Sequence, residues 1–211
     1  MSDRFVYTTP LDPRAQPLLE GLALEYATRY GDVLREPGEP KEIDRYPAHL
    51  FAPPHGNFVL LLRDGVAVGG GAFMRRDART AELKRVWTHA DLRRQGLASK
   101  VLLELEAQVL RQGYERICLT TGFRQPEAVG LYLGHGYTAL FGPAADPEAP
   151  RKLPFEKALR VTRQKGEAVA HPASLAEAVA HTASLAEEVA HTASLAEEVA
   201  HTASLAEAVQ R

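Results

Sequence analysis

The stretch from Arg93 to Ser99 carries the clearest chemistry in this chain. It reads Arg-Arg-Gln-Gly-Leu-Ala-Ser. It lies between Ala81–Thr88, whose alternation of Leu83, Arg85 and Trp87 predicts a strand, and an apolar run with helical spacing that begins at Leu97. The first amide groups of a helix have no acceptor within the helix, and the helix dipole favours negative charge there. Two arginines beside a helix start therefore predict an anion site, and a pyrophosphate fits it.

The motif around Gly96 differs from two common phosphate-binding loops. The chain has no G-x-x-x-x-G-K-[ST] sequence, and Gly69-Gly70-Gly71 lacks the G-x-G-x-x-G spacing. What remains is [R/Q]-x-x-G-x-[G/A], in which Gly96 lacks the Cβ that would obstruct a phosphate and Ala98 keeps the first helical turn thin. The helix continues on Val101, Leu105 and Val109 and is expected to stop at Gly113.

Further motifs follow in a fixed order. Arg116–Thr121 predicts a second strand, Pro126-Glu127-Ala128-Val129 starts a helix with Pro at its first position, and Leu131-Tyr132 with Gly136-Tyr137 forms an L-Y-x-x-x-G-Y pattern. Taken together between Ala81 and Leu140, these segments resemble the GNAT superfamily of N-acetyltransferases. The resemblance extends over about residues 4–160. It implies an α/β fold with a mixed, splayed β-sheet and helices on both faces, and acetyl-CoA as co-substrate.

The resemblance also implies roles for individual residues. Glu82 corresponds to a glutamate that acts as a base on the acceptor amine, and Tyr132 to a tyrosine that protonates the departing thiolate. From the residues alone, Glu82 could instead pair with Lys84 or Arg85, and Tyr132 could simply pack. The cofactor is expected to contact Val86, Trp87 and Thr88 through its pantetheine arm, with the side chain of Trp87 either in the core or against the cofactor. The pyrophosphate is expected on Arg93, Arg94, Gln95, Gly96, Leu97, Ala98 and Ser99.

The remaining elements are predicted from hydrophobic periodicity and turn residues. The three glycines Gly69-Gly70-Gly71 indicate a bulge or a close approach of another backbone. The predicted elements are a strand at Phe5–Thr9, a helix from Asp12-Pro13 to about Tyr30, an irregular connection at Gly31–Pro54, a hairpin of Asn57–Arg63 and Val66–Arg75 around Asp64-Gly65, a Pro-rich loop at Gly142–Pro154 and a last strand at Phe155–Leu159.

Length and composition predict one ordinary domain with an appendage. The chain has 211 residues, 45% of them apolar, so residues 1–162 are sufficient for a buried core. No stretch reaches the ~18 apolar residues of a membrane span, no signal peptide is evident, and the one cysteine, Cys118, is expected to fill the core. These features favour a cytoplasmic protein, bound to neither membrane nor metal.

Residues 163–211 form a tail with a ten-residue repeat, E-A-V-A-H-T-A-S-L-A and its variants. The repeat predicts a helical or partly disordered segment. Ten helical residues turn by about 1000°, so successive repeats do not share one face, which argues against a heptad coiled coil and a histidine metal array. A docking or oligomerisation helix is the alternative.

The net charge of −2 divides into −6 for Glu167–Arg211 and +4 for the rest. This positive excess is too small to predict nucleic-acid binding.

The sequence thus leads to one main functional hypothesis. It is an N-acetyltransferase that moves the acetyl group of acetyl-CoA to a primary amine of a small molecule. Acetylation of a protein lysine or N-terminus, and a non-catalytic acyl-CoA-binding module, are the alternatives. Homodimerisation stays open, and the identity of the amine is not encoded in any recognisable motif.

Overall fold

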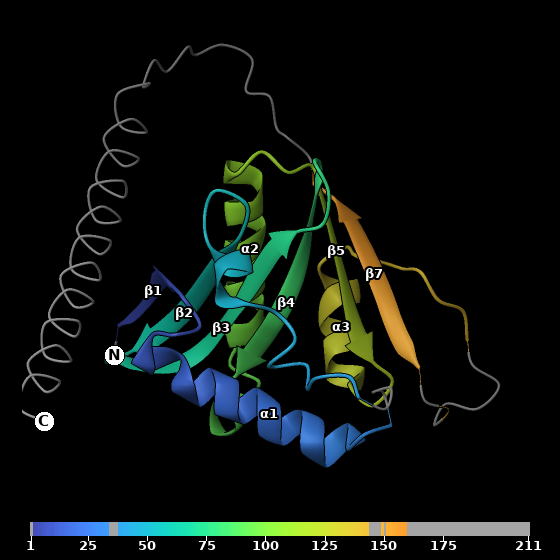
Figure 1. Ribbon diagram of the computed structural model, residues 1–211, viewed down its shortest axis with the longest axis horizontal. Coiled ribbons are helices and arrows are strands. Elements are labelled where there is room, and N and C mark those ends of the chain that lie inside the picture. The colour runs from blue at the N-terminus through green and yellow to red at the C-terminus, as the bar shows by residue number, and fades with distance from the viewer. Residues whose placement is uncertain (1, 34–37, 144–148, 150, 160–211) are drawn as a thin grey trace, which may run out of the picture. The chain divides into compact units, whose positions relative to one another are not determined.

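The computed structural model describes residues 2–33, 38–143, 149 and 151–159 (Figure 1). The repeats from residue 163 onwards, and the predictions made for them, lie outside these residues. The strands are β1 (Asp3–Thr8), β2 (Asn57–Arg63), β3 (Val66–Arg75), β4 (Thr80–Thr88), β5 (Arg116–Gly122), β6 (Thr138–Ala139) and β7 (Lys152–Ala158). The helices are α1 (Gln16–Tyr30), α2 (Leu97–Arg111) and α3 (Pro126–Gly134), with short 3₁₀ turns at Pro13–Ala15, Ala48–Phe51 and Ala90–Leu92.

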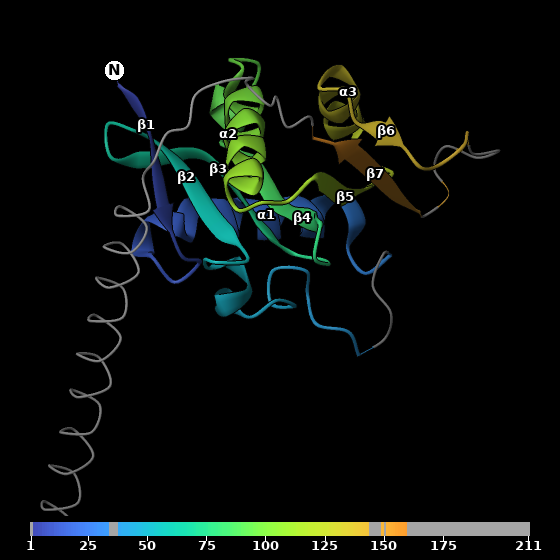
Figure 2. The ribbon, with the colours of Figure 1, turned by 90° about the horizontal axis from the view of Figure 1, so that it is seen from above.

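The strands form one mixed sheet in the order β1-β2-β3-β4-β5-β7-β6. Only β4 and β5 run parallel, and the other neighbours are antiparallel. Helix α1 lies on one face of the sheet, and α2 and α3 lie on the other (Figure 2). This arrangement confirms the predicted fold class.

Two hydrophobic clusters hold the layers together. On one face, Val101, Leu102 and Leu105 of α2 are fully buried against the sheet. On the other face, Leu18 and Leu22 of α1 pack with residues of β2, β3 and the 3₁₀ turn at Ala48–Phe51. The helical spacing read from the sequence therefore gives the correct buried faces for both helices.

Strand β4 contains a bulge that the sequence reading missed. Arg85 adopts φ +58°, and the register with β3 shifts between Gly70 and Ala72. As a result Leu83 faces the α2 cluster, whereas Arg85 and Trp87 face α1. The predicted single alternation of Leu83, Arg85 and Trp87 is therefore wrong, because one extra residue in a strand reverses the side-chain alternation beyond it.

Strands β4 and β5 separate soon after they meet. Their pairing covers only Thr80–Glu82 with Arg116–Cys118, while β5 stays paired with β7 as far as Gly122. Within the described residues, the edge of β4 from Leu83 to Thr88 thus has no strand partner on the β5 side. We call this opening the splay.

The three glycines of β3 are explained by close packing. A Cβ on Gly70 would lie 2.6 Å from Leu18 Cδ1 and 2.7 Å from the Val59 carbonyl oxygen, and one on Gly71 would lie 2.8 Å from Leu105 Cδ1. Both helix layers therefore approach the sheet at these residues. The expected bulge is confirmed by the register shift against β4. The close approach comes from the Leu18 and Leu105 side chains and from the carbonyl of the neighbouring strand, and not from a helix backbone.

The C-terminal part of the sheet differs from the prediction. Strand β7 begins at Lys152, three residues before the predicted Phe155, and it includes Pro154. Proline removes one ladder donor, but the Pro154 carbonyl still accepts a hydrogen bond from the Leu140 amide at 2.9 Å. Strand β6 was not predicted, since two residues are too short to show an alternation.

Candidate active site

The start of α2 has the geometry of an anion cradle. Gly96 precedes the helix with φ +74°, and Arg94 also lies in the left-handed region with φ +63°. The first bond of the helical ladder runs from the Lys100 amide to the Gly96 carbonyl, at 3.1 Å. The amides of Leu97, Ala98 and Ser99 precede that bond and point out of the helix start. We call Arg93–Ser99 the cradle.

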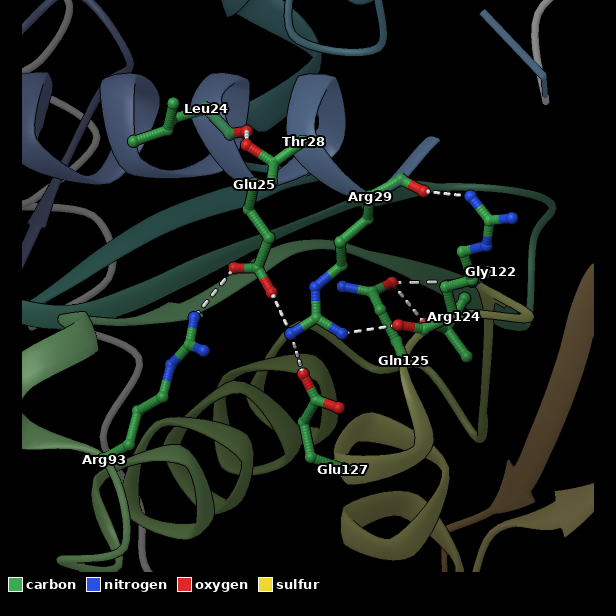
Figure 3. A network of polar contacts seen from close by, with 10 residues as sticks. Leu24, Glu25, Thr28, Arg29, Arg93, Gly122, Arg124, Gln125 and Glu127 are labelled. Atoms are coloured by element: carbon green, nitrogen blue, oxygen red, sulfur yellow. Dashed lines mark hydrogen bonds and ion pairs between the residues drawn. The ribbon is translucent and has the colours of Figure 1, made fainter. Parts of the chain in front are cut away.

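Arg93 connects the cradle to helix α1. Its Nη2 atom lies 3.0 Å from Glu25 Oε2 (Figure 3). Gln95, further along the cradle, accepts a hydrogen bond from Arg63 Nη1 at 3.2 Å. Arg94 is exposed, and Leu97 is buried in the α2 cluster. An anion in the cradle would compete with Glu25 for Arg93.

The same network reaches helix α3. Arg29 Nη2 lies 3.0 Å from Glu25 Oε1 and also pairs with Glu127 in the first turn of α3. The Arg29 guanidinium and carbonyl both bond to Arg124, whose Nη1 donates to the carbonyl at 2.9 Å (Figure 3). Helix α1 is thereby tied to the elements that follow β4 and β5, on both sides of the splay.

The splay exposes backbone rather than side chains of β4. Trp87 is 6% exposed and belongs to the α1 cluster, where a Cβ on Gly21 would lie 2.5 Å from its indole nitrogen. Val86 packs towards the α2 cluster. Of the two alternatives for the Trp87 side chain, the structure therefore shows the core position. Val86, Trp87 and Thr88 remain available to a ligand through their peptide groups.

A cavity of about 460 Å³ opens on the α1 side of the splay. It is lined by both diverging strands, through Glu82 and Lys84 of β4 and Thr120–Gly122 of β5. We call it the acceptor cavity. Its other walls are Ala23, Tyr26, Ala27, Tyr30, Gly31, Asp32, Pro40, Lys41, Glu42, Ile43, Arg45, Tyr46, Gln125 and Lys152.

Glu82 lies in this cavity as part of a charged group. Lys84 Nζ lies 2.9 Å from Glu82 Oε1 and 3.9 Å from Glu42 Oε1, and 4.6 Å from the centre of the Tyr46 ring. Burial lowers the pKa of Lys84, but its contacts with Tyr46 and Glu82 outweigh burial and raise it above the usual value. The salt bridge with Lys84 considered from the sequence is therefore present, and it keeps a positive charge beside Glu82.

Tyr132 is buried in helix α3. Its ring lies 5.5 Å from the rings of both Tyr137 and Phe155, and burial raises the pKa of its hydroxyl. The packing alternative for Tyr132 is therefore present in the structure, and its role as an acid stays a prediction.

Cys118 is only half-buried, which corrects the expectation of a core filler. It pairs in register with Glu82 at the last contact between β4 and β5, so both side chains point to the face of the acceptor cavity. Arg76 Nη1 lies 3.5 Å from its sulfur. Desolvation nevertheless raises the pKa of Cys118, and a protonated thiol is a poor nucleophile.

One further charged residue of the acceptor cavity was named from the sequence. Lys84 was considered as an ion-pair partner of Glu82, as expected for residues two apart on one face of a strand. Tyr26 of α1 also lines the cavity. Glu42 and Tyr46 come from the irregular segment Gly31–Pro54, which was flagged only as a whole, since no periodicity orients its side chains.

The family model for acetyltransferases of the GNAT family matches residues 22–137. This match spans more than half of the chain and includes β4, the cradle and α3. The chain belongs to the GNAT acetyltransferase family. The resemblance to this family that the sequence motifs indicated is thereby confirmed. No curated protein matches the sequence.

Solved structures agree with this GNAT assignment. A Klebsiella pneumoniae protein provisionally named an acyl-CoA N-acyltransferase is 25% identical with a TM-score of 0.57, and the match covers 75% of this chain and 98% of that one. A GNAT family acetyltransferase from Elizabethkingia anophelis with acetyl-CoA bound is 14% identical (TM-score 0.51; 74% and 98% covered). An N-acetyltransferase from Thermoplasma acidophilum in complex with coenzyme A is 15% identical (TM-score 0.52; 75% and 99% covered). The last two show the fold alone.

In the described part of this GNAT chain, no group of three or more histidine, cysteine or acidic side chains could hold a metal ion. None of the described helices is long and apolar enough to cross a membrane.

Proposed function

We propose that this GNAT protein is an N-acetyltransferase that moves the acetyl group of acetyl-CoA to the primary amine of a small molecule. One observation carries the proposal: the splay between β4 and β5 connects two complementary sites. The cradle follows the end of β4, and the acceptor cavity with Glu82 lies between the diverging strands. A donor with a pyrophosphate and a long amide-bearing arm fits this order of elements.

The residues of this chain fit acetyl-CoA in two ways. The cradle offers three helix-start amides, Gly96 in the left-handed conformation and the nearby guanidinium of Arg93, which suits a pyrophosphate. The free edge of β4 at Val86, Trp87 and Thr88 offers peptide groups that can bond to an extended arm like an added strand. When bound, acetyl-CoA supplies an activated acyl group with a thiolate as leaving group.

Glu82 is the proposed base for the acceptor amine. An amine attacks a thioester only as the free base, so a proton has to leave its nitrogen. The Glu82 carboxylate faces the acceptor cavity, and the Lys84 ammonium at 2.9 Å restricts its orientation. Glu82 therefore takes the proton of an amine bound in this cavity, directly or through one water.

Tyr132 is the proposed acid for the leaving thiolate. Because burial raises the pKa of its hydroxyl, the phenol keeps its proton throughout the neutral range and can donate it to a thiolate. Packing against Tyr137 and Phe155 already fixes the ring, so little further side-chain entropy is lost when Tyr132 acts as the acid. The acid and the base then belong to α3 and β4, on the two sides of the splay.

The shape of the acceptor cavity supports a small acceptor. It has walls on α1, on both strands and on the segment from Pro40 to Tyr46, and its volume of about 460 Å³ is within the range of small-molecule sites. A protein lysine would need a groove that also accepts the flanking backbone.

The proposal is tested by coenzyme A release from acetyl-CoA with the full chain. The acceptors are alkylamines, amino acids, polyamines, aminoglycosides and a lysine-containing peptide, each with mass analysis of the product. We expect release above the hydrolytic background with at least one small amine, and an acetylated product of matching mass. Binding of acetyl-CoA without transfer to any acceptor would show a binding module instead, and transfer to the peptide alone would show a protein acetyltransferase.

A further inference from the structure

A second cavity lies next to the acceptor cavity. It has a volume of about 360 Å³ and lies between α1 and the segment from Ile43 to Ala48. The two cavities share Ala23, Ile43 and Tyr46 as wall residues. The two cavities therefore lie side by side along α1.

Arg85 lines this second cavity as a buried cation. The residue is only 7% exposed. Its Nη2 atom donates to the Ile43 carbonyl oxygen at 2.8 Å, and its guanidinium lies 4.6 Å from the centre of the Phe51 ring. Its Nε atom is buried and has no hydrogen-bond partner within the described part of the chain. The guanidinium thus keeps one unsatisfied donor, and that atom is itself buried.

Among the described residues, no carboxylate forms an ion pair with Arg85. The nearby carboxylate of Glu42 pairs with Lys84 at 3.9 Å and with Arg45 at 3.7 Å. Glu20 and Asp44 also line the second cavity, but in the described residues neither forms an ion pair with Arg85. Burial lowers the pKa of Arg85 despite the opposing effect of Glu42 and Asp44. A buried charge without a paired anion is unfavourable and would gain from one.

The bulge in β4 is what brings Arg85 to this place. Without the extra residue at φ +58°, Arg85 would face α2, as the simple alternation predicts. With the bulge, Glu82, Lys84 and Arg85 share one face of the sheet. A left-handed arginine is an uncommon and strained conformation, and such residues gather at ligand sites.

We propose that Arg85 is an anion subsite of the acceptor site, and that the acceptor is an amine that carries a carboxylate. The inference rests on the proposed function for the amine end. The carboxylate would accept hydrogen bonds from the part of the Arg85 guanidinium that lines the second cavity, since a planar guanidinium matches a carboxylate in geometry and charge.

The spacing along β4 limits the length of this acceptor. Arg85 lies three positions after Glu82, which is at most about 10 Å along a strand and less across the bulge. An α-amino acid that uses its α-amine cannot span that distance, because its two charged groups are adjacent. An ω-amino carboxylate with an extended alkyl chain can do so. The chain therefore selects acceptors by the separation of amine and carboxylate.

The test is a binding experiment that involves no acetyl transfer. The full chain, saturated with coenzyme A, is titrated calorimetrically with 6-aminohexanoate and 8-aminooctanoate and with the corresponding amides. We expect at least one carboxylate to bind at least tenfold more tightly than its amide, about 1.4 kcal/mol. Glycine should bind no better than glycinamide. Equal affinities for both carboxylates and their amides in the unmodified chain overturn the proposal without any variant.

Substitutions test whether Arg85 causes the preference for the carboxylate over its amide. In Arg85→Met the tenfold preference for the carboxylate should disappear, and in Arg85→Lys part of it should remain because the positive charge is kept. Arg4→Met is the matched control, since Arg4 is exposed on β1, and it should keep the full preference. A preference that persists unchanged in Arg85→Met overturns the assignment.

Different results would contradict the proposed subsite and the proposed function. If no amine is acetylated but the carboxylate is still preferred in binding, the proposed function is wrong and the subsite stands. If alkylamines and ω-amino carboxylates are acetylated with equal kcat/KM, the function stands and the subsite is wrong.

Discussion

Replacing Glu82 with glutamine is expected to lower kcat for acetyl transfer about 10²–10⁴-fold, the usual contribution of a positioned base. Glutamine keeps the size of the side chain but cannot take a proton from the amine. The affinity for acetyl-CoA should stay unchanged, because the cradle and the free edge of β4 do not involve this carboxylate. Steady-state kinetics with a saturating amine, together with calorimetry for acetyl-CoA, measure the two quantities separately.

The control for this variant is Glu115→Gln. Glu115 lies just before β5, where it pairs with Arg79 and does not line the acceptor cavity, so its loss should leave kcat unchanged. Tyr132→Phe should lower kcat in the same way as Glu82→Gln, while Tyr137→Phe, a change in the ring beside it, should not. A kcat for Glu82→Gln close to that of the unmodified protein would remove Glu82 from the mechanism.

Replacing Gly96 with valine is expected to weaken acetyl-CoA binding at least about tenfold. Gly96 has φ +74°, and an L-residue pays about 1–2 kcal/mol in that region, more when it is β-branched. A valine would shift the backbone towards negative φ and turn the helix-start amides of Leu97, Ala98 and Ser99 away from the pyrophosphate. The dissociation constant of acetyl-CoA measures the effect.

Gly113→Val supplies the matched control for Gly96→Val. Gly113 follows the other end of α2 with φ +85°, and a Cβ at either glycine would meet no atom within 4 Å. Both variants should therefore lose at least about 1–2 kcal/mol of unfolding free energy through the same backbone strain. Only Gly96→Val should lose affinity for acetyl-CoA. Equal losses of affinity in both would attribute the effect to stability and not to the cradle.

Much of the fold could be predicted because its signals are local. The Asp64-Gly65 turn between two apolar runs gave the β2–β3 hairpin with its correct bounds, and the apolar spacing after Leu97 gave the buried face of α2. The cradle was predicted from one glycine and its neighbours for the same reason. Each of these features depends on residues close together in the chain.

The parts that were missed depend on contacts between distant residues. The bulge at Arg85 is defined by the register of β4 against β3. The sequence of β4 alone does not indicate it. Arg93 and Glu25 are 68 residues apart in the sequence, so their ion pair could not be foreseen. Glu42 and Tyr46 reach the acceptor cavity from a segment with no periodicity, so their orientation follows only from the packed structure.

The central claim is that acetyl-CoA occupies the splay between β4 and β5 with its pyrophosphate in the cradle. Amide hydrogen exchange of the full chain, followed by mass spectrometry with and without acetyl-CoA, tests it most directly. We predict slower exchange in peptides that cover Val86–Thr88 and Leu97–Ser99, and no change in the β2–β3 hairpin turn at Asp64-Gly65. Saturating acetyl-CoA that leaves both peptides unprotected, or protects the hairpin turn instead, would contradict this placement of the donor.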